Sequence, residues 1–203
     1  MKSIIKTLLC VFLLGFGVEA MAQMPSNKID KEVKKAAKDY TKDKWTVAPG
    51  ALPLARQLER SYKVEYETDA KFNPKYVTGQ GQSQGEVWDA ARMTAQAMSK
   101  AELANKISSQ ITGLVEAQLK NQEFPNDQAA SVVQVCEEFK SICEQKLGPV
   151  ITLMELQRTT KAGTKEVLIR TAYNIGEGLK IGKNFIDSEC KKKGIPYVMT
   201  IEQ

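Results

Sequence analysis

Three glycines before the longest helical pattern are the first residues whose spacing could indicate chemistry. Gly79, Gly81 and Gly85 lead into that pattern, and backbone N–H groups at the start of a helix commonly bind phosphate. A dinucleotide-binding loop needs G-x-G-x-x-G, whereas this chain has G-x-G-x-x-x-G. A P-loop needs Lys and then Ser or Thr where Glu86 and Val87 stand. The spacing therefore argues against a nucleotide site.

Residues able to do acid–base or metal chemistry are few. The chain contains no histidine, which removes Ser-His-Asp and Cys-His catalysis and histidine-based metal sites. Its acidic groupings are Glu137 with Glu138, and Glu155 with Glu166. Adjacent glutamates on a helix point to different sides, and glutamates on a hairpin usually lie in solvent. We therefore predict that the protein is not an enzyme and has no catalytic residue, no cofactor and no metal site.

Residues 1–22 are typical of a secretory signal peptide. Two lysines precede an apolar run at residues 8–18, which is too short for a membrane-spanning helix of about 20 residues. Ala20 and Ala22 supply the small-residue pattern of a cleavage site, so we expect cleavage after Ala22. The sequence therefore predicts a periplasmic or secreted protein.

The cysteines bear on both lipid anchoring and disulfides. Lipidation needs a small residue before the cysteine, and Leu9 precedes Cys10, so a lipoprotein is not predicted. An exported protein can form disulfides. Cys136 and Cys143 are two helical turns apart, about 10 Å, which is beyond the reach of a disulfide. Any bridge within the chain would therefore include Cys190, and three buried free thiols are the alternative.

Residues 23–73 are predicted to form a helical N-terminal extension with too few apolar residues for a core of its own. Ile29, Val33 and Tyr40 recur at helical spacing, and lysines occupy the other faces. Such a helix can dock on the main domain with a solvated lysine face, or lie on an anionic membrane surface. Docking is favoured, because the apolar side is modest and acidic residues dilute the positive charge.

Residues 74–203 are predicted to form one α+β domain. The order strand, long helix, helix, strand, strand, helix indicates an open sandwich. Its small antiparallel sheet of about three strands would be covered by two or three helices. The predicted strands are residues 75–83, 150–160 and 165–174, and the predicted helices run from about 84 to 119, 127 to 147 and 176 to 193.

The glycine stretch also has a structural explanation. Alternation along a strand puts Gly79, Gly81 and Ser83 on one face, and Ser83 with Glu86 forms a capping box that would start the helix. An alanine-rich helix could then approach the glycines closely. The predicted packing seam comprises Gly79, Gly81, Ser83, Glu86, Ala91 and Ala95. The predicted buried stripe of the helix contains Ala90, Thr94, Ala97, Ala101, Ala104, Ser108, Ile111 and Val115.

Four segments together resemble a known family. They are "VTGQGQS", "WDAARMTAQAMSKAELANKI", "VITLMELQRT" and "KEVLIRTAYN". Over residues 74–193 the chain resembles the LPP20-like family of exported bacterial proteins, and "WTVAPGALPLARQL" is similar to a segment found before such domains in uncharacterised proteins of Bacteroidetes-type bacteria. The resemblance implies a dodecin-like open sandwich with helices on one side of the sheet, a place in the cell envelope and no catalytic residues. The residues that carry it on the long helix are Ala91, Arg92, Ala95, Ala97, Glu102, Leu103 and Ala104.

These observations predict a non-catalytic exported cell-envelope protein that binds another protein or an envelope polymer, or serves as a structural component. The alternative is a small-ligand-binding oligomeric module of dodecin-like fold. In that case Trp88 is the candidate aromatic residue for contact with the ligand. The net charge of +5 favours anionic neighbours but lacks the basic-patch signature of a nucleic-acid binder. We expect no nucleic-acid partner and no membrane span after cleavage. Outer-membrane association and homo-oligomerisation are left open.

Overall fold

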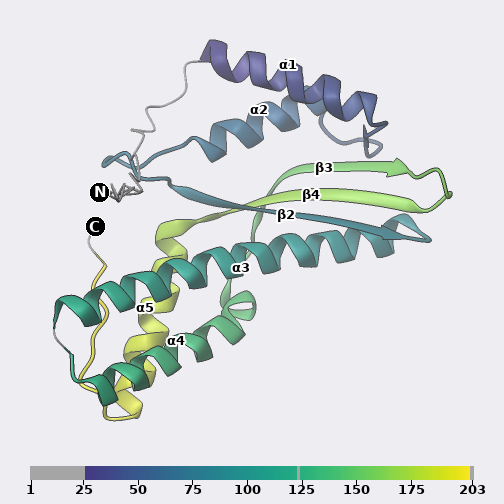
Figure 1. The fold of residues 1–203 in the computed structure, drawn as a ribbon. Coiled ribbons are helices and arrows are strands. Elements are labelled where there is room, and N and C mark those ends of the chain that lie inside the picture. The colour runs from purple at the N-terminus through teal and green to yellow at the C-terminus, as the bar shows by residue number, and fades with distance from the viewer. Residues whose placement is uncertain (1–25, 123, 202–203) are drawn as a thin grey trace, which may run out of the picture.

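The computed structural model describes residues 26–122 and 124–201 (Figure 1). The predicted signal peptide, with Ala20 and Ala22, lies outside these residues. Within them, no helix is long and apolar enough to cross a membrane. The elements are α1 Ser26–Lys42, β1 Thr46–Val47, α2 Leu54–Glu65, β2 Tyr76–Gly85, α3 Trp88–Asn121, α4 Asn126–Lys146, β3 Ile151–Thr159, β4 Lys165–Asn174 and α5 Ile175–Lys192.

The described residues form an α+β fold around an open antiparallel sheet, which confirms the predicted fold class. The sheet has four strands in the order β1-β3-β4-β2 rather than about three. The additional strand is β1, where Thr46 and Val47 pair with Gln157 and Leu156 of β3. A two-residue strand shows no alternation in sequence, so the pattern predicted only helices and turns in this segment.

Helices cover both faces of the sheet (Figure 1). On one face α1 and α2 form an apolar cluster with β3 and β4, and α3 lies against the other face. A sheet with helices on one side, as the family resemblance implies, is therefore wrong for this chain. The predicted docking of the N-terminal helix is confirmed, because Ile29 and Val33 are buried in the first cluster. That cluster contains Ile29, Val33, Trp45, Leu58, Met154, Leu156 and Leu168.

Helix α3 belongs to two parts of the molecule (Figure 1). Its first half packs beneath β2 and β4, and its second half packs with α4 and α5 around large apolar side chains such as Ile111 and Phe139. We call the sheet with α1, α2 and the first half of α3 the sheet lobe, and the rest the helical lobe. The described part of the C-terminal tail, up to residue 201, adds no strand to the sheet, and its Tyr197 and Met199 are buried in the helical lobe.

The predicted boundary between the glycine strand and the long helix is wrong. β2 continues to Gly85, and α3 begins at Trp88 after Val87, with no side chain capping its N-terminus. Ser83 and Glu86 therefore do not form a capping box. The reason is the partner strand, because Ser83 pairs with Val167 of β4 and the ladder continues through Gly85. Sheet hydrogen bonds that depend on distant residues override the local helix signal.

The predicted buried stripe is also wrong for the first half of α3. Ala90, Thr94 and Ala97 are exposed, whereas Ala91 and Ala95, which the predicted packing seam includes, are buried together with Ser99. The stripe predicted for the second half is buried at Ala104, Ser108, Ile111 and Val115. Both stripes have helical spacing, and only the position of the sheet decides which one is covered.

Candidate functional site

The predicted packing seam brings four of its six residues together. An ideal Cβ on Gly81 would lie 1.9 Å from the carbonyl oxygen of Ala95, and one on Gly79 would lie 2.3 Å from that of Ser99. These distances leave no room for a side chain between β2 and α3. Ala91 and Ala95 are fully buried on the facing side of α3, while Ser83 is half-buried and Glu86 is exposed. The glycines therefore lie against helix backbone.

The other face of β2 is open and polar. Alternation places Gln80, Gln82 and Gln84 on the sheet face that α1 and α2 cover over β3 and β4. Within the described residues, the cluster beneath α1 and α2 contains none from β2, and all three glutamines are exposed. We call this row of Gln80, Gln82 and Gln84 the glutamine ledge.

Glu166 of β4 holds two of these amides in place. One carboxylate oxygen, Oε1, accepts hydrogen bonds from Nε2 of Gln82 at 2.7 Å and of Gln84 at 3.2 Å. The other accepts from Nε of Arg158 at 2.6 Å. An ionised carboxylate only accepts, so both amide nitrogens face it and both amide oxygens point elsewhere. Among the described residues, no side chain or backbone group donates to those amide oxygens.

The environment of Glu166 keeps it ionised. Its side chain is buried, with 3 % of the residue exposed. Burial alone would raise its pKa, but the hydrogen bonds from Arg158, Gln82 and Gln84 and the positive charge of Arg158 lower the pKa below its ordinary value. Glu166 therefore stays a hydrogen-bond acceptor at neutral pH and keeps the two glutamines oriented.

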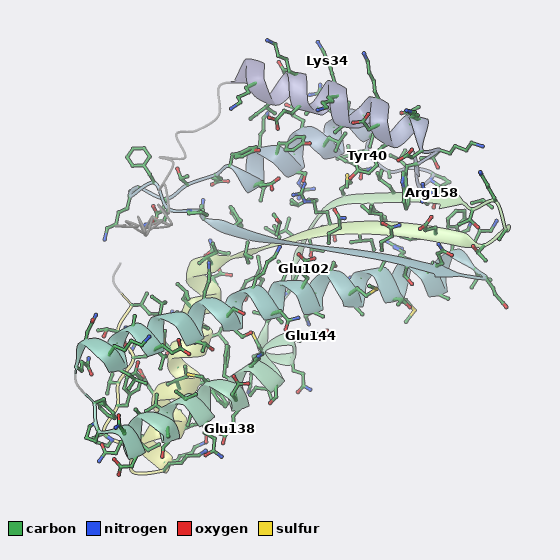
Figure 2. All side chains as sticks on the ribbon, in the orientation of Figure 1. Lys34, Tyr40, Glu102, Glu138, Glu144 and Arg158 are labelled. Carbon is green, nitrogen blue, oxygen red and sulfur yellow. The ribbon has the colours of Figure 1, made fainter. Side chains whose placement is uncertain are left out.

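A basic hollow of about 650 Å³ lies at one end of the ledge. It is formed where α1 ends beside the β3–β4 hairpin, and Figure 2 shows Arg158 at this end of the sheet. The guanidinium of Arg158 lies 4.3 Å from the ring centre of Trp45, and its Nη1 donates to the carbonyl of Asp43 at 2.9 Å. The hollow is lined by Lys42, Asp43, Lys44, Gln84, Arg158, Thr159, Thr160, Lys161, Ala162 and Glu166.

Lys44 occupies a strained position in the wall of this hollow. Its φ of 62° is left-handed, a region that glycine adopts at much lower cost. The N–H of Trp45 donates to the carbonyl of Tyr40, and the N–H of Lys44 donates to that of Thr41. These two bonds form a Schellman cap, whose left-handed residue is usually glycine. Here a lysine takes that place and projects from the end of α1.

Two smaller hollows are connected to the basic hollow through shared residues. One of about 280 Å³ shares Asp43 with it and is lined by Tyr40, Tyr62 and Arg170 among others. The next, of about 350 Å³, shares Arg170 and reaches Gln80. Figure 2 shows Tyr40 on the side of α1 that faces the sheet. The second hollow lies between α1, α2 and β4, and the third lies at the edge of β2 beside α3.

Helix α3 covers part of the outer edge of β2. Glu102 accepts a hydrogen bond from the backbone N–H of Gln80 at 2.7 Å, and Lys106 donates to the carbonyl of Thr78 at 2.8 Å. Burial raises the pKa of Glu102, but hydrogen bonds from Lys106 and Gln80 and the charge of Lys106 give a net lowering. Glu102 and Lys106 form an ion pair that occupies the backbone of Gln80 and Thr78. The pair therefore blocks the addition of another strand to this part of the β2 edge.

The cysteines and the acidic groupings form no reactive site among the described residues. Cys136, Cys143 and Cys190 are buried free thiols, which is the second of the two alternatives that the sequence left open. Burial raises the pKa of Cys136 to about 12 and of Cys143 to about 11, and raises that of Cys190 as well. No three potential ligands gather as a metal site in the described part of the chain.

Trp88, the glutamine ledge and the basic hollow differ in how far the sequence could predict them. Trp88 is half-buried against the apolar cluster of α3 and β4, beneath the ammonium of Lys165. The ledge could have been found, because glutamine repeats at every second position in "GQGQSQG". The basic hollow could not, because its walls come from segments more than 100 residues apart in the chain.

Comparisons with known proteins identify no relative. A scan against protein-family models, a search of curated proteins and a search of solved structures each found no match. The resemblance to the LPP20-like family rests on the segments quoted above and stays a prediction.

Proposed function

We propose that this protein is a non-catalytic, exported cell-envelope protein that binds an acidic polysaccharide along the glutamine ledge. The observation that carries the proposal is the carboxylate of Glu166, which orients the amides of Gln82 and Gln84. Their oxygens are acceptors on one strand face, carried by residues that are about 7 Å apart along the strand. Ordered acceptors in a row favour a ligand that repeats hydroxyl donors along its length, because little side-chain entropy is lost on binding.

The basic hollow supplies the charge that an acidic ligand needs. Lys44 and Lys161 are exposed there. Arg158 is fixed by Glu166, by Trp45 and by a backbone carbonyl. Among the described residues no acceptor is bonded to Nη2 of Arg158, which leaves that nitrogen for a ligand carboxylate. Amide oxygens beside fixed and flexible cations therefore suit a carboxylate-bearing sugar polymer.

The strain at Lys44 supports a binding role for this end of the ledge. A left-handed residue other than glycine costs roughly 1–2 kcal/mol. Among the described residues, the side chain of Lys44 makes no ion pair that would offset this conformational strain. Strain retained at a solvent-facing cation is consistent with a use in ligand binding.

The proposal is tested by affinity electrophoresis and calorimetry with alginate, hyaluronate and uncharged dextran. We expect the two acidic polymers to bind and dextran to bind far more weakly. The double variant Gln82→Ala/Gln84→Ala should lower the affinity for the acidic polymers at least about tenfold, because two hydrogen bonds are lost. Lys44→Gly should lower it severalfold while the fold is retained.

The matched control is Gln134→Ala/Gln145→Ala, which removes two exposed glutamines from α4 in the helical lobe. It should bind as the unaltered protein does. Equal losses in both double variants, or no preference for the acidic polymers over dextran, would overturn the proposal. Thermal melts of each variant separate loss of binding from loss of fold.

Three predictions made from the sequence remain beside this proposal. Export rests on the pattern of residues 1–22, and the family rests on the quoted segments. A small-ligand-binding oligomer stays an alternative prediction. The absorbance spectrum of the purified protein tests this alternative, since a bound chromophore would add absorbance beyond that of the aromatic residues.

A further inference from the structure

Helix α1 is held to the protein by one side. Ile29 and Val33 are buried against α2 and the sheet, and Ala36, Ala37 and Tyr40 pack partly into the same cluster. These residues form one stripe at helical spacing. The opposite side of α1 is therefore fixed in orientation and faces outward.

That outward side consists of lysines. At 100° per residue, six lysines of α1 fall within an arc of about 120°, centred opposite the buried stripe. All six are exposed, and none makes an ion pair with a described residue. Figure 2 shows Lys34 pointing away from the sheet. We call this set the lysine face: Lys28, Lys31, Lys34, Lys35, Lys38 and Lys42.

The acidic residues of α1 lie outside this arc. Asp30 falls on one margin, and Glu32 and Asp39 fall on the other. Asp39 is exposed and lines the hollow that Tyr40, Tyr62 and Arg170 also line. The acidic residues of α1 therefore flank the lysine face and do not interrupt it.

We infer that the lysine face docks the protein on an anionic lipid surface. The row extends about 21 Å along a straight helix, and its members other than Lys42 line none of the hollows found. A straight row of cations without a groove fits a flat charged surface. Because the apolar side of α1 is already buried, attachment is electrostatic and does not need insertion into the bilayer.

The geometry sets the orientation of the attached protein. Docking through α1 places the sheet above the membrane and the helical lobe on the far side of the sheet (Figure 1). The ledge runs along the foot of α1 and α2 and stays open at its side. This inference does not depend on the polysaccharide proposal, because all of the lysines it uses except Lys42 lie outside the ledge and the basic hollow.

The test is co-sedimentation of the protein, purified after export, with vesicles. One set contains phosphatidylglycerol and phosphatidylcholine, and the other contains phosphatidylcholine alone. We expect binding only to the first set, with loss of binding as salt is raised, since exposed charges are screened. The variant Lys31→Glu/Lys35→Glu/Lys38→Glu should lower the partition coefficient at least about a hundredfold.

The control keeps the net charge of that variant but changes a different surface. Lys120→Glu/Lys146→Glu/Lys191→Glu alters exposed lysines of the helical lobe, and we expect its vesicle binding to be preserved. Equal losses in both variants, or equal binding to both vesicle sets, would overturn the inference. It would also be overturned if the α1 variant lost alginate binding while the unaltered protein ignored anionic vesicles. Gln82→Ala/Gln84→Ala should leave vesicle binding unchanged, so failure of one proposal is distinguishable from failure of the other.

Discussion

Helices α1 and α5 end in the same way in two different lobes. Each has a Schellman cap, with the N–H of Trp45 bonded to Tyr40 at the end of α1 and the N–H of Ile195 bonded to Cys190 at the end of α5. The left-handed residue is Gly194 in the helical lobe and Lys44 in the sheet lobe, with φ of 68° and 62°. The helical lobe uses the residue of lowest cost, whereas the sheet lobe keeps a strained cation at its basic hollow.

The two halves of α3 show the same contrast in packing. In the sheet lobe, glycines bring β2 against the backbone of α3. In the helical lobe, Gly182 faces the side chain of Ile111. Backbone cannot move aside without disturbing the helix, but a side chain can change rotamer. The sheet lobe therefore tolerates little change beneath the ledge, and the helical lobe tolerates more.

The largest expected effect on stability is for a methyl group added to a glycine of the sheet lobe, compared with the same change in the helical lobe. Gly81→Ala should lower the free energy of unfolding by about 3 kcal/mol, because its Cβ would meet the carbonyl of Ala95 at 1.9 Å. Gly182→Ala meets the flexible end of Ile111 and gains helix propensity, so it should cost about 1 kcal/mol or less. Urea denaturation measures both, and equal losses would remove the contrast between the lobes.

The next effect is a dependence on pH that belongs to the sheet lobe. Because the pKa of Glu166 is lowered in the folded protein, its contribution is complete above the unfolded pKa of about 4.3 and is lost as pH falls through the folded value. Glu166→Gln should lower the free energy of unfolding near pH 7 by about 2 kcal/mol and flatten the curve in that acid range.

The matched change in the helical lobe is Glu138→Gln. It breaks the exposed pair of Glu138 with Lys193 and should change stability by about 0.5 kcal/mol or less. Denaturation curves at several pH values compare the two variants. If both curves kept the slope of the unaltered protein, Glu166 would not be the group responsible.

Exchanging the two cap residues should give smaller effects of opposite sign. Lys44→Gly should raise the free energy of unfolding by about 1 kcal/mol, because glycine adopts a left-handed φ without strain. Gly194→Lys should lower it by about the same amount. Thermal melts would detect both shifts, and a loss of stability in Lys44→Gly would show that lysine is not strained there.

The smallest effect is expected for the thiols of the helical lobe. The raised pKa values of Cys136, Cys143 and Cys190 leave almost no thiolate near neutral pH. A thiol-reactive dye should label none of them in the folded protein and all three in urea. Rapid labelling of any one in the native state would mean that this lobe opens readily.

Local patterns predicted much of the fold. Helical periodicity predicted α3, α4 and α5, and alternation predicted β3 and β4. Both patterns can be recognised within a short stretch of consecutive residues. Three features depended on distant partners and were missed. They are the strand at Thr46, the extension of β2 past Ser83, and the exposure of Ala90, Thr94 and Ala97 on α3, although burial of Ala91 and Ala95 was predicted correctly. Each was decided by where the sheet lies, which no local window contains.

The candidate site also combines features visible in the local sequence with features that depend on distant residues. The repeat of Gln80, Gln82 and Gln84 is visible in the sequence as alternation along a strand. The anchoring of these residues by Glu166, and the placing of Lys44 beside Arg158, require the register of β2 on β4 and the position of α1. The proposed chemistry therefore depends on tertiary structure more than the fold class does.

Hydrogen exchange in the presence of alginate tests the central claim most directly, namely that the sheet lobe holds the binding surface. The ligand should slow exchange in residues 76–85 and 158–166, where the ledge and the basic hollow lie. It should leave residues 126–146 and 175–192 of the helical lobe unchanged. Protection confined to the helical lobe, or bound alginate without protection of residues 76–85, would contradict the account.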